Sequence, residues 1–109
     1  MLKFRYSMQG ILNLKYRLED QAKGIFAAAK QKYEEEVEKL TTLNQEKTLY
    51  EENLRKLMLG SLDFHEIQAV KTGIIAKEDA IKKQSRVVMR AEHEMQAASE
   101  RLKELMVDR

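Results

Sequence analysis

Few side chains in this sequence have the types and spacing that catalysis or metal binding requires. His93 and Glu94 match the first two residues of the His-Glu-x-x-His motif on the zinc-binding helix of metallopeptidases. Ala97, however, occupies the position of the second histidine ligand. The only other histidine, His65, has no set of partner ligands in the sequence either. We therefore interpret both histidines as surface residues of a helix and expect no metal site.

Two runs of carboxylates, Glu34–Glu36 and Glu51–Glu52, are the remaining candidates for general acid–base chemistry. We expect them on a solvated helical face, where carboxylates are not desolvated as such chemistry requires. The four glycines are isolated, and no Gly-Lys-Ser/Thr sequence forms a phosphate-binding loop. Gly24 and Gly73 lie inside expected helices, where they mark either a close approach or a weak point. We therefore expect that the chain is not an enzyme, has no catalytic residues and binds no cofactor.

The strongest pattern in the sequence is a heptad repeat in its second half. An apolar residue occupies every seventh position over six heptads: Ile67, Ile74, Ile81, Val88, Met95 and Leu102. Three residues after each comes the second position of the seam: Val70, Lys77, Gln84, Ala91, Ala98 or Leu105. Such spacing keeps one stripe of a helix facing a partner helix, as in a coiled coil, and no proline interrupts it.

The first half carries a seam of its own, whose members follow one another in steps of three or four: Ile11, Leu14, Leu18, Ala22, Ile25, Ala29, Tyr33, Val37, Leu40, Leu43, Lys47, Tyr50, Leu54 and Leu57. The steps alternate regularly from Leu40 onward. Between Ile25 and Val37, however, three steps of four occur together and are followed by two of three. We expect this slip to unwind and then overwind the supercoil locally. Ser7, just ahead of the seam, is the expected N-cap.

A short turn separates the two seams. Gly60 can adopt the left-handed conformation that ends a helix. Asp63 can cap the next helix, with Glu66 reaching back as in a capping box, and Leu62 and Ile67 stand at the positions of a hydrophobic staple. A connection this short forces the two helices to be antiparallel neighbours.

The expected fold is all-α, a long antiparallel two-helix coiled-coil hairpin. It forms a single domain over residues 1–109, with a first helix over about 7–59, a turn at 60–62 and a second helix over about 63–108. Folding back at the turn pairs residues whose numbers sum to about 120, such as Leu40 with Ile81. Lys47, Lys77 and Gln84 intrude into the seam, and we expect the lysines to reach past their neighbours to water.

The charges are distributed unevenly along the chain. Residues 1–32 hold seven Lys or Arg and two acids, net +5, whereas residues 33–109 hold thirteen and sixteen, net −3. The basic start is either a solvated face or a contact with an acidic partner. Acids interleave with the cations almost everywhere beyond residue 32, so we expect no nucleic-acid partner. No apolar run is long enough to span a bilayer, so we expect no membrane insertion.

The opening stretch Lys3–Lys15 resembles the start of the FliJ family, small soluble proteins of the flagellar type III export apparatus. Leu18–Lys23, Gly60–Asp63 and Arg90–Leu102 are similar to later parts of that family. The resemblance runs along the whole chain, but most of its motifs are those of any coiled coil, and the opening thirteen residues carry most of the weight. Relatives usually continue for a further Lys/Glu-rich stretch, whereas this sequence ends at Arg109.

The resemblance implies a non-catalytic coiled-coil stalk that binds in the middle of the export ATPase hexamer. It also implies contacts with the membrane protein of the export gate and with export chaperones. The chain would be cytoplasmic and peripherally associated with the inner face of the cell membrane at the flagellar base, and a monomer when free. We expect the basic open end to insert into the ring, through Lys3, Arg5, Lys15, Arg17 and Lys23.

The alternative is a structural coiled coil that self-associates and has no motor partner. It would need a further apolar stripe outside the seam. Leu12, Phe26 and Leu49 are too scattered along the first helix to form one.

Overall fold

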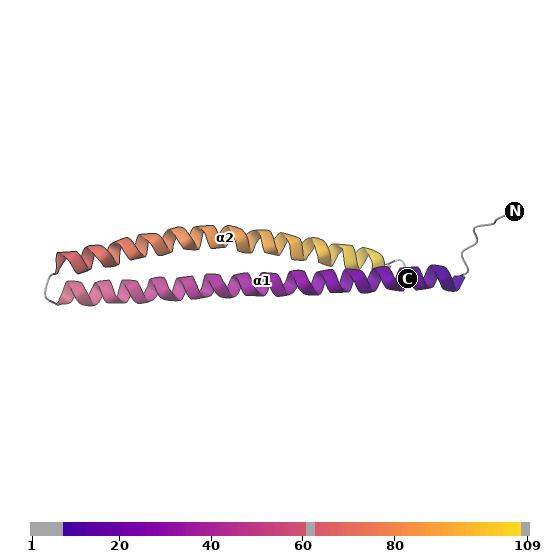
Figure 1. Ribbon diagram of the computed structural model, residues 1–109, viewed down its shortest axis with the longest axis horizontal. Coiled ribbons are helices and arrows are strands. Elements are labelled where there is room, and N and C mark those ends of the chain that lie inside the picture. The colour runs from indigo at the N-terminus through magenta and orange to yellow at the C-terminus, as the bar shows by residue number, and fades with distance from the viewer. Residues whose placement is uncertain (1–7, 61–62, 108–109) are drawn as a thin grey trace.

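Two long helices lie side by side in the computed structural model, which describes residues 8–60 and 63–107. Helix α1 spans Met8–Leu59 and helix α2 spans Phe64–Val107. They run antiparallel, and α1 continues past the end of α2 at the open end of the hairpin (Figure 1). The radius of gyration is 25.0 Å, against roughly 13 Å for a compact domain of this size. The predicted all-α hairpin is therefore confirmed.

Asp63 caps the start of α2. Its Oδ1 accepts hydrogen bonds from the backbone N–H groups of His65 and Glu66 at 3.0 and 3.3 Å. Its carbonyl oxygen accepts the first helical bond, from the N–H of Ile67 at 3.0 Å. These bonds satisfy donors that a helix start leaves without partners, and they confirm the predicted cap. The expected staple residue Leu62 and the expected N-cap Ser7 lie outside the described residues.

The conformation of Gly60, at the end of α1, differs from the prediction. Gly60 has no positive φ, so it does not adopt the left-handed conformation expected of a glycine at a helix end. Its N–H donates to the carbonyl oxygen of Lys56 at 3.1 Å, the bond that an α-helix would make at this position. The left-handed conformation predicted for Gly60 is therefore wrong: the residue directly follows Leu59, the last residue of α1, and adds one more helical hydrogen bond.

The interface side of α2 follows the heptad repeat without interruption. All twelve heptad positions from Ile67 to Leu105 are buried or half-buried. Ile67, Ile74 and Ala91 are the most enclosed of them. Because a rod of two helices buries only one stripe of each, these side chains and their partners on α1 form nearly all of the core.

The interface side of α1 differs from the predicted seam. Ile25 is 56% exposed and Leu18 is also exposed, whereas their neighbours Phe26 and Glu19 are half-buried and buried. Farther along, Glu36 is buried, next to a half-buried Val37. The stripe that faces α2 alternates in steps of four and three without a break: Lys15, Glu19, Ala22, Phe26, Ala29, Tyr33, Glu36, Leu40, Leu43, Lys47, Tyr50, Leu54 and Leu57.

The predicted slip in the supercoil therefore does not occur. The physical reason lies in α2, whose strict heptad repeat presents a regular surface that only a regular stripe on α1 can follow along its length. Keeping this register buries two carboxylates, Glu19 and Glu36, and leaves Ile25 outside.

The two helices approach closely where Tyr50 crosses Gly73. A Cβ atom at Gly73 would lie 3.4 Å from Cε2 of the Tyr50 ring, so the aromatic ring occupies the space beside the glycine. Lys77 Nζ lies 5.9 Å from the centroid of the same ring. Gly24, by contrast, has no atom within 4 Å of the place where its Cβ would stand. Of the two interpretations of these glycines, close approach applies to Gly73 and a weak point to Gly24.

Candidate partner-binding surfaces

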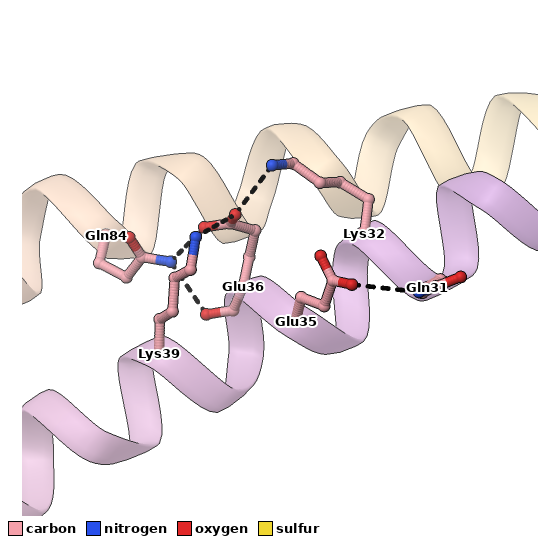
Figure 2. A network of polar contacts seen from close by, with 6 residues as sticks. All are labelled: Gln31, Lys32, Glu35, Glu36, Lys39 and Gln84. Carbon is pink, nitrogen blue, oxygen red and sulfur yellow. Dashed lines mark hydrogen bonds and ion pairs between the residues drawn. The ribbon is translucent and has the colours of Figure 1, made fainter.

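A polar layer crosses the middle of the seam (Figure 2). Gln84 Nε2 on α2 donates to Glu36 Oε2 at 2.6 Å and to the Glu36 backbone carbonyl at 2.9 Å. On α1, Lys32 Nζ and Lys39 Nζ approach the other carboxylate oxygen, Oε1, at 3.0 and 3.1 Å. The Glu36 residue is only 3% exposed, whereas both lysine side chains are mostly exposed.

The surroundings of Glu36 keep it ionised. The hydrogen bond from Gln84, followed by those from Lys32 and Lys39, lowers the pKa of the Glu36 carboxyl from 4.5 to about 2. A carboxylate that is ionised at neutral pH, and whose oxygens are occupied by three donors, is not poised to exchange protons. We therefore interpret this layer as a structural element that favours one register of the two helices.

Ion pairs join the two helices between this layer and the turn. Lys77 Nζ lies 2.5 Å from Glu46 Oε2, and Lys47 Nζ lies 3.9 Å from Glu78 Oε1. The hydrogen bond to Glu46 raises the pKa of Lys77. The sequence predicts that both lysines reach water from their seam positions, but each instead reaches a carboxylate on the opposite helix.

The grooves described along the two helices are open to solvent. Among residues 8–60 and 63–107, no three His, Cys, Asp or Glu side chains are grouped to hold a metal ion. A groove beside Gln84, bordered by Leu43, Glu35 and Glu46, is open to solvent and does not enclose a ligand. Neither described helix contains a segment long and apolar enough to cross a membrane. The surfaces that remain for function are the outer faces and the ends of the rod.

The basic residues expected to bind a partner are only partly brought together. Lys15 is half-buried at a seam position, whereas Arg17 and Lys23 are exposed. Residues two apart on a helix do not face each other, so Lys15 and Arg17 point to different sides of α1. Lys3 and Arg5 lie outside the described residues.

An exposed apolar stripe on α1 accompanies these cations at the open end. Ile11, Leu14, Leu18 and Ile25 are all exposed, and their spacing of three, four and seven places them on one side of the helix. The heptad pattern assigns these residues to the seam, so the sequence does not reveal the stripe. The sequence nevertheless contains an indication of this second stripe. The first half has more apolar residues at helical spacing than one seam can hold, including the adjacent pair Ile25 and Phe26.

Comparison with known proteins identifies the family of this chain. The family model described as the flagellar FliJ protein matches residues 4–109, nearly the whole chain. The comparisons of this chain with the curated proteins and with the solved structures found no match. The matched range covers both helices, the turn and nearly all of the opening stretch that resembles this family. The chain therefore belongs to the flagellar FliJ protein family and, with that family, is a component of the flagellar protein export apparatus.

Proposed function

We propose that the protein is a non-catalytic coiled-coil stalk that binds the ring of the export ATPase through the open end of its hairpin. The observation that carries this proposal is the exposed apolar stripe Ile11, Leu14, Leu18 and Ile25, which shares that end with Arg17 and Lys23. Monomeric soluble proteins rarely expose contiguous apolar surface without a partner for it. Family membership supplies the export apparatus in which that partner is to be found.

The dimensions of the rod suit an axial position in a ring. Two helices side by side measure roughly 20 Å across, a width that the pore of a hexameric ring can admit. Burial of a large apolar side chain contributes roughly 1.5–3 kcal/mol when it is complete, so four half-exposed side chains supply a useful part of a binding energy. Arg17, Lys23 and the expected contacts Lys3, Arg5 and Lys15 would then steer the end toward an acidic pore.

The proposal extends to contacts with the export gate and the export chaperones. Its support for these partners is the family alone, since the described surfaces do not single out a residue for either of them. The ring contact is therefore the part that mutagenesis of this chain can test first.

The test measures stimulation of the export ATPase by the chain. Arg17→Glu with Lys23→Glu is expected to reduce stimulation at least about tenfold, because two attractive charges at the inserted end become repulsive. Arg55→Glu with Lys56→Glu is the matched control, since it reverses two exposed charges near the turn. Circular dichroism establishes that both variants are folded. Equal stimulation by the two variants would show that the open end does not bind the ring.

Self-association remains the second candidate function, and the same apolar stripe is the specific observation in its favour. Two copies could pack their stripes against each other and form a four-helix bundle at the open end. Sedimentation at micromolar concentration separates the two functions. A stalk should have the mass of one chain, 12.8 kDa, whereas a stable dimer or tetramer that Leu14→Asp dissociates would favour the structural coiled coil.

A further inference from the structure

A second charged surface lies on the middle of α2, away from the open end. Lys82, Lys83, Arg86 and Arg90 fall within nine residues that contain no acid, and no other nine-residue stretch of the chain holds four cations. All four side chains are exposed. Their spacing of three, four and seven residues places Lys83, Arg86 and Arg90 on the same side of the helix.

These cations are not used to hold the hairpin together. Lys83 Nζ pairs with Asp79 Oδ2 at 3.1 Å on the same helix, and both side chains are mostly exposed. Within the described part of the chain, the side chains of Lys82, Arg86 and Arg90 form no ion pair and no hydrogen bond. Lys77, by contrast, connects α2 to α1. The energy of folding therefore does not explain why four cations are gathered on this face.

An apolar side chain stands among the charges. Met89 is 60% exposed, next to Arg90 and three residues from Arg86, so it shares their side of α2. Methionine is flexible and polarisable, which suits a contact surface that must adapt to its partner. The face therefore offers one apolar contact surrounded by positive charge, and its Met and Arg residues are types that protein interfaces are enriched in.

The extent of the face limits what can bind it. Lys82 and Arg90 are about 12 Å apart along the helix axis. Glu78 and Asp79 precede this stretch, and Glu92 and Glu94 follow it. A nucleic-acid backbone or an anionic membrane carries its charge well beyond such a length and would meet these carboxylates. An acidic helix, with its carboxylates confined to two or three turns, fits between them.

We propose that this α2 basic face, formed by Lys82, Lys83, Arg86, Arg90 and Met89, binds an acidic α-helix of a partner protein. The contact is additional to the ring contact, because it lies on the side of the rod and uses no residue of the open end. Charge complementarity sets its orientation and rate of association, and Met89 packs against an apolar side chain between the partner's carboxylates.

The experiment titrates the intact protein into a fluorescently labelled helical peptide of about five turns, whose Glu residues are spaced every four residues and confined to the central two or three turns, with one Leu among them. The same peptide with Gln in place of Glu, duplex DNA, and vesicles of equal phosphatidylserine and phosphatidylcholine are the other probes. The Glu peptide is expected to bind with an affinity that weakens as salt is raised, and more tightly than the other three probes.

Arg86→Glu with Arg90→Glu should weaken binding of the Glu peptide at least about tenfold. Arg55→Glu with Lys56→Glu changes the net charge equally at exposed positions near the turn and should leave the affinity unchanged. The proposal is overturned if the Gln peptide binds as tightly as the Glu peptide, or if both double variants weaken binding equally. Tighter binding to DNA or to vesicles, lost in the Arg86 and Arg90 variant, would likewise exclude the acidic helix as the occupant.

The ring contact at the open end and the helix contact at the α2 basic face can be refuted independently of each other. Arg86→Glu with Arg90→Glu should stimulate the export ATPase as the unchanged chain does, because it leaves the open end intact. Arg17→Glu with Lys23→Glu should in turn bind the Glu peptide normally. One variant pair therefore reports on each surface.

Discussion

Glu36 is a charged residue at a seam position where an apolar side chain is expected, and its surroundings compensate for its burial. A buried carboxylate without partners would cost several kcal/mol. Here each oxygen has a donor, because Gln84 reaches one from the opposite helix and Lys32 and Lys39 reach the other from neighbouring turns. The lysine ammonium groups remain in contact with water, so the Glu36 carboxylate is the only charge of this network that is removed from water. Glu36 therefore stays ionised inside the seam.

The stability of the hairpin should depend on pH through Glu36. The folded-state pKa, about 2, lies below the usual value of 4.5, so the native state favours the ionised form. Its contribution is fully present above pH 4.5 and is lost as the pH falls toward 2. Glu36→Gln should therefore be less stable than the unchanged chain at neutral pH, by a margin that shrinks across this window.

Urea unfolding at a series of pH values measures that margin. Glu52→Gln, which neutralises an exposed carboxylate on α1, is the control and should show little difference at any pH. A margin for Glu36→Gln that is the same above and below the window would mean that the carboxylate charge does not stabilise the seam.

The glycines inside the two helices should respond oppositely to leucine. Gly24→Leu places its side chain in open space and replaces a poor helix former, so it should stabilise the chain by about 1 kcal/mol. Gly73→Leu must displace the Tyr50 ring, and the cost of overpacking, about 1–3 kcal/mol, should exceed the gain in helix propensity. Thermal melts of both variants decide the matter, and an equal gain at the two positions would contradict the close contact of Tyr50 with Gly73.

The two helices differ in how strongly they specify their own interface. α2 has one apolar stripe, and it faces α1 along its whole length. α1 has two stripes near its start, one through Ala22 and Phe26 and another through Leu18 and Ile25. Only one can face α2, and the other remains exposed at the end where α1 continues past α2 (Figure 1). The free stripe is thus a consequence of an excess of apolar residues on one element.

Alanine substitutions should distinguish the two stripes. Phe26→Ala removes a half-buried aromatic side chain from the interface and should cost about 1.5–3 kcal/mol. Ile25→Ala removes a side chain that is 56% exposed and should cost about 0.5 kcal/mol or less. Chemical denaturation of the two variants provides the comparison. A larger loss for Ile25→Ala would place the stripe through Leu18 and Ile25, and not the observed one, against α2.

As a whole molecule, the chain is a rod with little interior. The few enclosed apolar residues include Ala22, Ile67, Ile74 and Ala91, two of which are small. Such a structure has a modest reserve of stability, since the entropy of ordering two long helices is offset by burial of a single seam. It also exposes most of its side chains to solvent.

A monomeric rod should unfold independently of its own concentration. If the exposed stripe on α1 is reserved for another protein, the melting temperature should stay constant over about a hundredfold range of chain concentration, because folding is then unimolecular. Circular dichroism in cells of different path length measures this directly. A melting temperature that rises with concentration, and stops rising in Leu14→Asp, would show that the chain pairs with itself through that stripe.

The sequence alone was enough to predict the hairpin, the antiparallel order of the helices and the interface of α2. Asp63 at the turn and the apolar residues at every seventh position from Ile67 act through local chemistry and helical period, which need no knowledge of the partner. The resemblance of the opening stretch to the FliJ family likewise rests on the residues alone, and the match over residues 4–109 agrees with it.

Which stripe of α1 meets α2 depends on contacts that exist only in the folded hairpin. Apolarity favours Val37 over Glu36, since a carboxylate in a seam is costly unless it has partners, and it does not distinguish Ile25 from Phe26. One partner of Glu36 comes from the opposite helix: Gln84 lies 48 positions away on α2, and it reaches Glu36 only once the hairpin has formed. The energy of a seam residue depends on the surface opposite it, which one helix's sequence does not contain. For the same reason, the apolar face left free for a partner is defined only when the interface is complete.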